Sequence, residues 1–221
     1  MEQLATQSII RWEGIADGLL RDTGPHDGPV DAIALALRCG LTPVPSPCAH
    51  GALSPDGTLF YPAGTNHRQQ QRKVARKVAR WLLAQHELAP TSEAVTHVAA
   101  ALLLPETSFR ADLARHGWNL RSLKGHYPNV TLTEMTYRVA MLHEAAVAVF
   151  DHGIPTWRRV TGSDLEHASA APTRFETHLA ELAFESEVPI QAPERLWAIP
   201  LSTPGRILTV CDAKQLLPRV A

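Results

Sequence analysis

The sequence has little cysteine and no long apolar run. Its three cysteines, Cys39, Cys48 and Cys211, are odd in number and lack the spacing of a metal-binding motif. This scarcity argues against a disulfide framework and favours a reducing compartment. The longest apolar run, near residues 98–104, is far shorter than the roughly 20 residues that a membrane helix needs. Residues 1–7 lack the basic and apolar parts of a signal peptide, so we expect a cytoplasmic protein outside the membrane.

An excess of charge of either sign is also lacking. The formal net charge is -1, with 45% hydrophobic and 19% charged residues, which is typical of a soluble globular protein and argues against wholesale coating of nucleic acid. The charges are unevenly spread, however. Residues 68–80 contain six basic and no acidic side chains, whereas residues 163–194 are mainly acidic. The length of 221 residues allows one domain with a sizeable core, or one domain with a small annex.

Apolar periodicity and turn residues predict a mixture of helices and short strands. Prolines make residues 41–47 extended because they block both helix and central strand. Residues 162–172 are small and polar and predict a linker. Hairpins are expected from 52–54 with 58–61, 146–150 with 154–160, and 196–201 with 206–210. Helices are expected at residues 5–22, 29–40, 68–86, 92–104, 109–115, 118–126, 131–144 and 174–186.

The helix expected at residues 68–86 carries a basic stripe. Its arginines recur at every fourth residue and so share one face: Arg68, Arg72, Arg76 and Arg80. The opposite face is apolar and includes Val74, Val78, Trp81 and Leu82. We expect this apolar face to be buried, with Trp81 and Leu82 packed against Leu102 and Leu103 of the next helix.

Several segments together resemble the ImmA/IrrE-type zinc metallopeptidases. The segments are, in order, Pro29-Val-Asp31, Cys39-Gly-Leu41, Val74-Ala-Arg-Lys-Val-Ala-Arg-Trp-Leu-Leu83, Val98-Ala-Ala-Ala-Leu-Leu-Leu-Pro105, Pro128-Asn-Val-Thr131 and Arg138-Val-Ala-Met-Leu142. The resemblance covers roughly residues 5–160. It implies a zincin-like fold in which the helix at 68–86 would hold the metal.

The resemblance breaks down at the metal-binding positions. The family has A-H-E-x-x-H on this helix, and here the first His, the general base and the second His fall on Arg76, Lys77 and Arg80. The carboxylate ligand of the next helix falls near Ser92 or Glu93. Guanidinium and ammonium groups have no lone pair to offer a metal, and their charge repels a cation. We therefore expect no zinc, no other cofactor and no peptidase activity.

These cations could form a solvated basic face, as charge runs on helices usually do. Alternatively, they could still point into the former catalytic cleft and make it a site for an anion or a protein partner. The counter-charge could then be internal, from Glu93 or Glu87, or external. The candidate residues of this cleft are Arg72, Arg76, Lys77, Arg80, Glu93 and His97.

A relocated metal site is a further alternative. His86-Glu87 and His143-Glu144 begin like zincin motifs, but Pro90 and Val147 occupy the positions of the second ligand. Glu93 and His97 lie one helical turn apart and could form half a metal site, although a polar helix face explains them equally well. A hydrolase with relocated ligands would have to be built from Glu93, His97, His86 and Glu87.

Residues 106–145 contain three short helices that could mimic a helix-turn-helix. The last of them carries one basic residue, Arg138, against Glu134, whereas recognition helices present more donors to the major groove. This favours a packing module over a DNA-binding one.

We thus expect an α+β protein with a zincin-like minimal metallopeptidase domain at residues 1–160, which includes the helix-turn-helix-like segment 106–145. A small α+β extension would follow at residues 161–221. The resemblance implies a pseudo-metallopeptidase of a bacterium or phage that binds a helix-turn-helix regulator of mobile-element or stress genes without cutting it. The alternatives are an anion or nucleic-acid binding module that uses the stripe from Arg68 to Arg80, and the relocated hydrolase.

Overall fold

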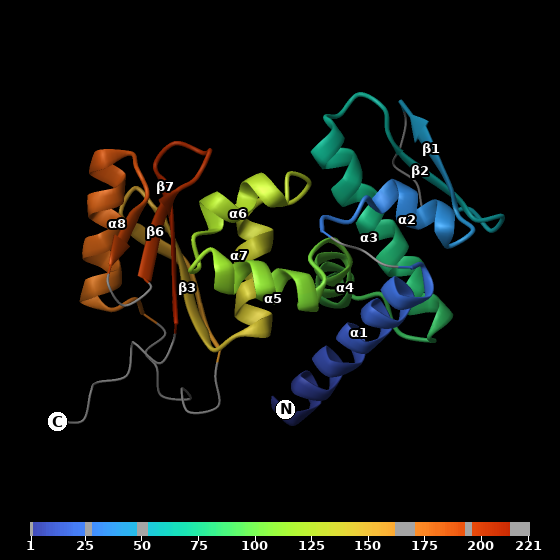
Figure 1. Cartoon of the computed structure of the whole chain (residues 1–221), viewed down its shortest axis with the longest axis horizontal. Helices are drawn as coiled ribbons and strands as arrows, with labels where there is room; N and C mark the ends of the chain where they lie inside the picture. Colours follow the sequence, from blue (N-terminus) through green and yellow to red (C-terminus); the bar gives the residue numbers. More distant parts are fainter. Residues whose placement is uncertain (1, 25–27, 48–52, 162–170, 193–195, 213–221) are drawn as a thin grey trace. The chain divides into compact units, whose positions relative to one another are not determined.

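The computed structural model describes residues 2–24, 28–47, 53–161, 171–192 and 196–212 of the chain, with the side chains of residues 2–6 left aside (Figure 1). The described part is a mixed α+β protein with eight helices and seven strands in two sheets. The chain divides into two compact units. The N-terminal unit comprises Met1–Phe109 with Gly125–Thr131, and the C-terminal unit comprises Arg110–Lys124 with Leu132–Ala221.

Four helices form the body of the N-terminal unit: α1 (Glu2–Asp22), α2 (Ala32–Arg38), α3 (His67–Gln85) and α4 (Ser92–Leu103). α3 packs against both α2 and α4, and α1 packs against α4. Side chains cap the starts of the two central helices, since Asn66 accepts a hydrogen bond from the Gln69 amide and Thr91 accepts one from the Ala94 amide. The helices expected at 5–22, 68–86 and 92–104 are confirmed within a few residues.

The core of this unit lies between α3 and α4. The side chains buried in it include Val74, Val78 and Leu82 from α3, and Leu102 and Leu103 from α4. The predicted apolar face of α3 is therefore correct for these residues. Trp81 is less deeply buried than these residues, because part of its surface is exposed. The apolar pattern alone does not show how deeply an aromatic residue at the edge of the apolar face is buried.

The fully buried Gln71 ties α3 to the start of α2. Its Oε1 accepts a hydrogen bond from the Ala32 amide, and its Nε2 donates to Oδ1 of Asp31 at 2.9 Å. Asp31 is also the N-cap of α2, because the same oxygen accepts from the amides of Ile33 and Ala34. These bonds give a structural role to the Pro29-Val-Asp31 segment.

A two-stranded parallel sheet of β1 (Thr42–Ser46) and β2 (Thr58–Pro62) completes the described part of the N-terminal unit. The extended segment predicted around the prolines is thus a strand with one partner, where proline is tolerated. Residues Ser54–Gly57 form a tight turn before β2, closed by hydrogen bonds from Ser54 N to Thr58 O and from Gly57 N to Ser54 O. Gly57 has a φ of +83° that favours glycine. The expected hairpin is seen only as a bridge between Leu53 and Leu59, since Ala52 lies outside the described residues.

The C-terminal unit is built on a five-stranded antiparallel sheet in the order β4-β3-β7-β6-β5. The strands are β3 (Ala145–Asp151), β4 (Ile154–Val160), β5 (Ile190–Ala192), β6 (Leu196–Pro200) and β7 (Arg206–Asp212). Helix α8 (Arg174–Ser186) packs on β5, β6 and β7, and α7 (Leu132–Leu142) packs on β3 (Figure 1). The two predicted hairpins are confirmed. The three-residue β5 was not predicted, because it is too short to show a period.

This sheet divides the chain differently from the boundary expected at residue 160. β3 pairs along its whole length with β7, from Ala145 opposite Asp212 to Asp151 opposite Arg206. The last hairpin therefore extends the sheet begun by β3 and β4, instead of forming a separate annex. The predicted linker at 162–172 lies almost wholly outside the described residues.

The remaining helices are α5 (Glu106–Arg115) and α6 (Leu120–His126). α5 begins directly after Pro105, three residues before the predicted start, and the Phe109 amide donates to the Pro105 carbonyl in its first turn. Within the C-terminal unit, the Trp197 indole donates to the Gly117 carbonyl at 3.2 Å. None of the described helices is both long and apolar enough to cross a membrane.

Candidate functional site

The two cations Lys77 and Arg80 line a cavity of about 630 Å³ between α3 and the Ser54–Gly57 turn. We call it the basic cavity. α3 contributes Lys77, Arg80, Trp81, Ala84 and Gln85, and the segment before β2 contributes Leu53, Ser54, Pro55 and Gly57. Of the candidate cleft residues, Lys77 and Arg80 thus line a cavity on the side of α3 that faces the turn before β2.

Among the described residues, none that lines the basic cavity is acidic. The turn does contain one acidic residue, Asp56, but its carboxylate is hydrogen-bonded within the turn. Its carboxylate accepts hydrogen bonds from the Thr58 amide at 3.1 Å and from the Thr58 hydroxyl at 3.0 Å. These bonds hold the pKa of Asp56 below its usual value. The lining of the cavity thus has a net positive charge.

The ammonium group of Lys77 is electrostatically unfavourable in this place. Partial burial lowers the pKa of Lys77, and the neighbouring positive charges of Arg80 and Lys73 lower it further. An anion in the cavity would oppose both effects, because it would compensate the lost hydration and the repulsion between like charges. The cavity is therefore suited to bind a negative group.

Trp81 gives the basic cavity an apolar wall. The indole is half-buried and lies beside the two cations, with Leu53 and Pro55 on the opposite side of the cavity. The sequence predicted the turn at Pro55-Asp56-Gly57 but gave no signal that it approaches α3. The turn residues are thus the part of the site that sequence reasoning missed.

Arg76 points to a different neighbour. Its Nη1 donates to the hydroxyl of Thr96 on α4 at 3.1 Å, and this hydroxyl donates to the Ser92 carbonyl at 2.7 Å. Arg76 is half-buried between these helices and does not line the basic cavity. Within the stripe, Arg68 is exposed and Arg72 is half-buried. The stripe therefore does not act as one surface.

The predicted internal counter-charge is not formed. Glu93 and Glu87 are both exposed, and among the described residues neither makes an ion pair with Arg76 or Arg80. Glu93 lies in the first turn of α4, where its negative charge interacts favourably with the helix dipole. Of the two sources left open for the counter-charge, an internal pair with Glu93 or Glu87 is therefore not seen among the described residues.

His97 is directed towards α1. It is buried, and its Nε2 lies 2.5 Å from Oε1 of Glu13. The Trp12 ring packs beside it, with ring centroids 5.5 Å apart. His97 therefore belongs neither to the basic cavity nor to a pair with Glu93. Sequence reasoning missed Glu13, because 84 residues separate it from His97.

The other candidate histidines also lie apart. His86 is exposed at the end of α3, and the His143 ring packs 5.3 Å from that of Trp118. In the part of the chain that the structure describes, no three His, Cys, Asp or Glu side chains are grouped so that they could hold a metal ion.

Arg138, the single basic residue of α7, is fully buried. It cannot donate to a DNA major groove from that position, since its side chain is enclosed within the protein, and α7 packs on β3. The helix-turn-helix-like segment thus includes a helix that supports the sheet of the C-terminal unit.

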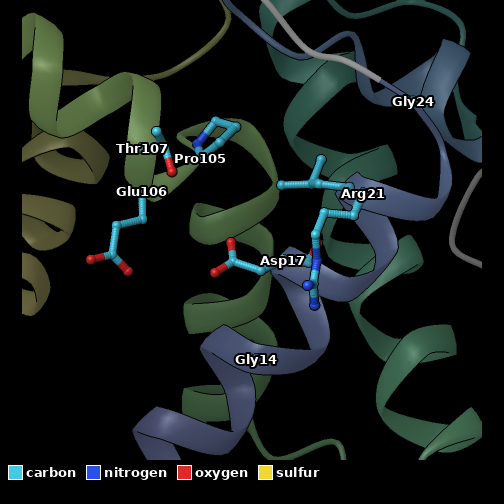
Figure 2. Close-up of a pocket in the computed structure, with 8 residues that line it drawn as sticks. Gly14, Asp17, Arg21, Gly24, Pro105, Glu106 and Thr107 are labelled. Carbon is cyan, nitrogen blue, oxygen red and sulfur yellow. The ribbon is translucent and has the colours of Figure 1, made fainter.

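A second cavity of about 590 Å³ lies between α1 and the start of α5. Figure 2 shows Asp17 and Arg21 on α1 across this space from Pro105, Glu106 and Thr107. Its charges are mixed, with Arg21 also donating to the Asp17 carbonyl. A lining of both signs selects no class of ligand, so this cavity is a weaker candidate than the basic cavity.

No family model and no curated protein matches the sequence. Among solved structures, the chain is similar to one described as a transcriptional regulator from Mycobacterium tuberculosis. The TM-score is 0.61 with 15% sequence identity, over 91% of this chain and 76% of that chain. At this level of identity, the similarity shows a shared fold.

Proposed function

We propose that this chain is a regulatory protein-binding module with the architecture of a zincin-like peptidase and without its metal chemistry. One observation carries the proposal. The α3 positions that match the two His ligands and the general base of the ImmA/IrrE-type family hold Arg76, Lys77 and Arg80. Around them, α3 and α4 keep a well-packed core of Val74, Val78 and Leu102.

The contacts of the three cations support a binding role over a catalytic one. Arg76 is engaged by Thr96, and Lys77 and Arg80 line the basic cavity. A divalent cation at this helix would meet three positive charges and would lack the several convergent donors that zinc requires. A negative group on a protein partner would instead find complementary charge.

We further propose that the partner is a helix-turn-helix transcriptional regulator in a bacterial or phage cytoplasm. The family resemblance favours this partner, and a regulator is the printed description of the similar solved structure. The chain would bind the regulator and leave it intact, so that binding alone changes the regulator's activity.

Co-expression with a helix-turn-helix regulator, taken from beside the gene of this chain where one is encoded there, tests the proposal. We expect the two proteins to co-purify, the regulator to remain uncut, and elemental analysis of chelator-free protein to give zinc far below one equivalent. Cleavage of the regulator that a chelator abolishes would refute the proposal. A matched control is co-expression with an unrelated helix-turn-helix protein of similar charge, which should not co-purify.

A nucleic-acid binding module is the alternative with the next best support, because α3 carries six cations within residues 68–80. It is less favoured because Arg76 is engaged by Thr96 on α4 and because Arg138 is buried. Phosphate contacts would make such binding fall steeply with salt concentration. A contact with an apolar centre would be much less sensitive to salt.

A further inference from the structure

The two cations of the basic cavity are arranged to share one anionic group. Lys77 and Arg80 are three residues apart on α3, so their side chains leave the helix on neighbouring positions of one face. The guanidinium fork matches the two oxygens of a carboxylate, and the ammonium group adds a point charge beside it. A single carboxylate between them would therefore accept hydrogen bonds from both.

The rest of the lining is suited to an apolar group next to that carboxylate. Trp81, Leu53 and Pro55 present apolar surface on both sides of the cavity. The volume of about 630 Å³ lies within the range of roughly 300–1,000 Å³ that is common for ligand sites, and it can hold a few side chains. A ligand that fills it should be acidic at one point and apolar at the next.

Such a ligand is more peptide-like than nucleic-acid-like. Nucleic-acid affinity depends on many phosphate contacts, and this lining offers two cations. A peptide with alternating acidic and apolar side chains matches the two kinds of surface found here.

From this complementarity, we propose that the basic cavity binds an acidic segment of the protein partner. One Glu or Asp carboxylate lies between Lys77 and Arg80, and a neighbouring aliphatic side chain packs on Trp81. The inference rests on the proposed function and deepens it, because it assigns the contact and its chemistry.

Calorimetric titration of the full chain tests the assignment with a short blocked peptide that carries Glu-Leu-Glu between serines. We expect saturable binding that a matched Gln-Leu-Gln peptide does not show. Lys77→Gln with Arg80→Gln should weaken binding at least about tenfold, because charge-assisted contacts are lost. Trp81→Ala should weaken it as well, through the apolar contact.

The control variant also removes one arginine and one lysine from α3, at positions outside the cavity. Arg68 and Lys73 are exposed and absent from the cavity lining, so Arg68→Gln with Lys73→Gln should change the affinity by less than about threefold at physiological salt. Thermal melts of both double variants should match the wild-type melt within a few degrees, which would show that affinity and not folding has changed.

Several outcomes would overturn the inference. They are no binding of the Glu-Leu-Glu peptide at millimolar concentration, equal losses in the two double variants, or binding of inorganic phosphate or a short DNA duplex as tight as that of the peptide. Co-purification with the regulator, measured on the same variants, separates the two claims. If the regulator binds wild type and Lys77→Gln with Arg80→Gln equally, the proposed function stands and this contact is wrong. If the peptide binds and no regulator does, the cavity assignment stands and the proposed function fails.

Discussion

Trp81→Ala tests whether the indole forms the wall of the basic cavity or part of the core between α3 and α4. The structure leaves Trp81 half-buried beside the cavity, whereas Leu102, on α4, is fully buried. Truncation of a fully buried Leu costs about 2–5 kcal/mol, because transfer energy is lost and a void is created. Trp81 borders the cavity, so its truncation creates no closed void and should cost the transfer energy alone, about 2 kcal/mol.

Urea denaturation of the wild type, Trp81→Ala and Leu102→Ala measures this difference. We expect the free energy of unfolding to fall more for Leu102→Ala than for Trp81→Ala. The shift in melting temperature should follow the same order, at roughly 2–4 °C per kcal/mol for a chain of this size. An equal loss for the two variants would show that Trp81 lies in the helix interface. The cavity assignment, and with it the proposed peptide contact, would then be wrong.

Three further predictions concern single groups. Because burial and the charges of Arg80 and Lys73 lower the pKa of Lys77 in the folded state, the charged form destabilises the fold at neutral pH. Lys77→Gln should therefore have a higher free energy of unfolding than wild type at neutral pH. This difference in unfolding free energy should shrink as the pH rises from the lowered pKa of Lys77 in the folded state through the ordinary pKa of lysine. If urea denaturation shows that the difference grows with pH, the predicted sign is wrong. Glu176 is fully buried and accepts two hydrogen bonds from Arg158, at 3.3 Å from Nε and 3.0 Å from Nη2. Glu176→Gln should therefore lower the free energy of unfolding by about 3–5 kcal/mol, whereas Glu181→Gln, at an exposed position of the same helix, should be nearly neutral. Burial raises the pKa of the Cys39 thiol, so iodoacetamide should label Cys39 in the native protein more slowly than in urea at the same pH, as peptide mass spectrometry can measure; equal rates would mean that the thiol is freely accessible.

The helices of the N-terminal unit could be predicted because their signals are local. The apolar stripe of α3 and the N-cap residues Asn66 and Thr91 act within a few residues of their effect. Helix α8 lies at the predicted residues, and a capping box formed by Thr173 and Glu176 fixes its start.

The site could be predicted only in part, because half of its residues come together through contacts between segments that are far apart in the sequence. The sequence singled out Lys77 and Arg80 but not the turn around Pro55, which approaches α3 through tertiary packing. The pairing of His97 with Glu13 was equally invisible, and it removes His97 from the cleft to which it was assigned. Periodicity shows which face of a helix is apolar, but it does not show which neighbour each polar residue meets.

The position of β7 in the sheet has a consequence for how the protein is synthesised. β7 lies between β3 and β6, so β3 lacks one of its two neighbours until residues 206–212 have left the ribosome. During that interval the unpaired edge of β3, with the apolar Ala146, Val147 and Ala148, is a template for pairing with other nascent chains. The C-terminal unit should therefore depend on chaperones during translation more than the N-terminal unit, in which α3 packs against the helices directly before and after it in sequence.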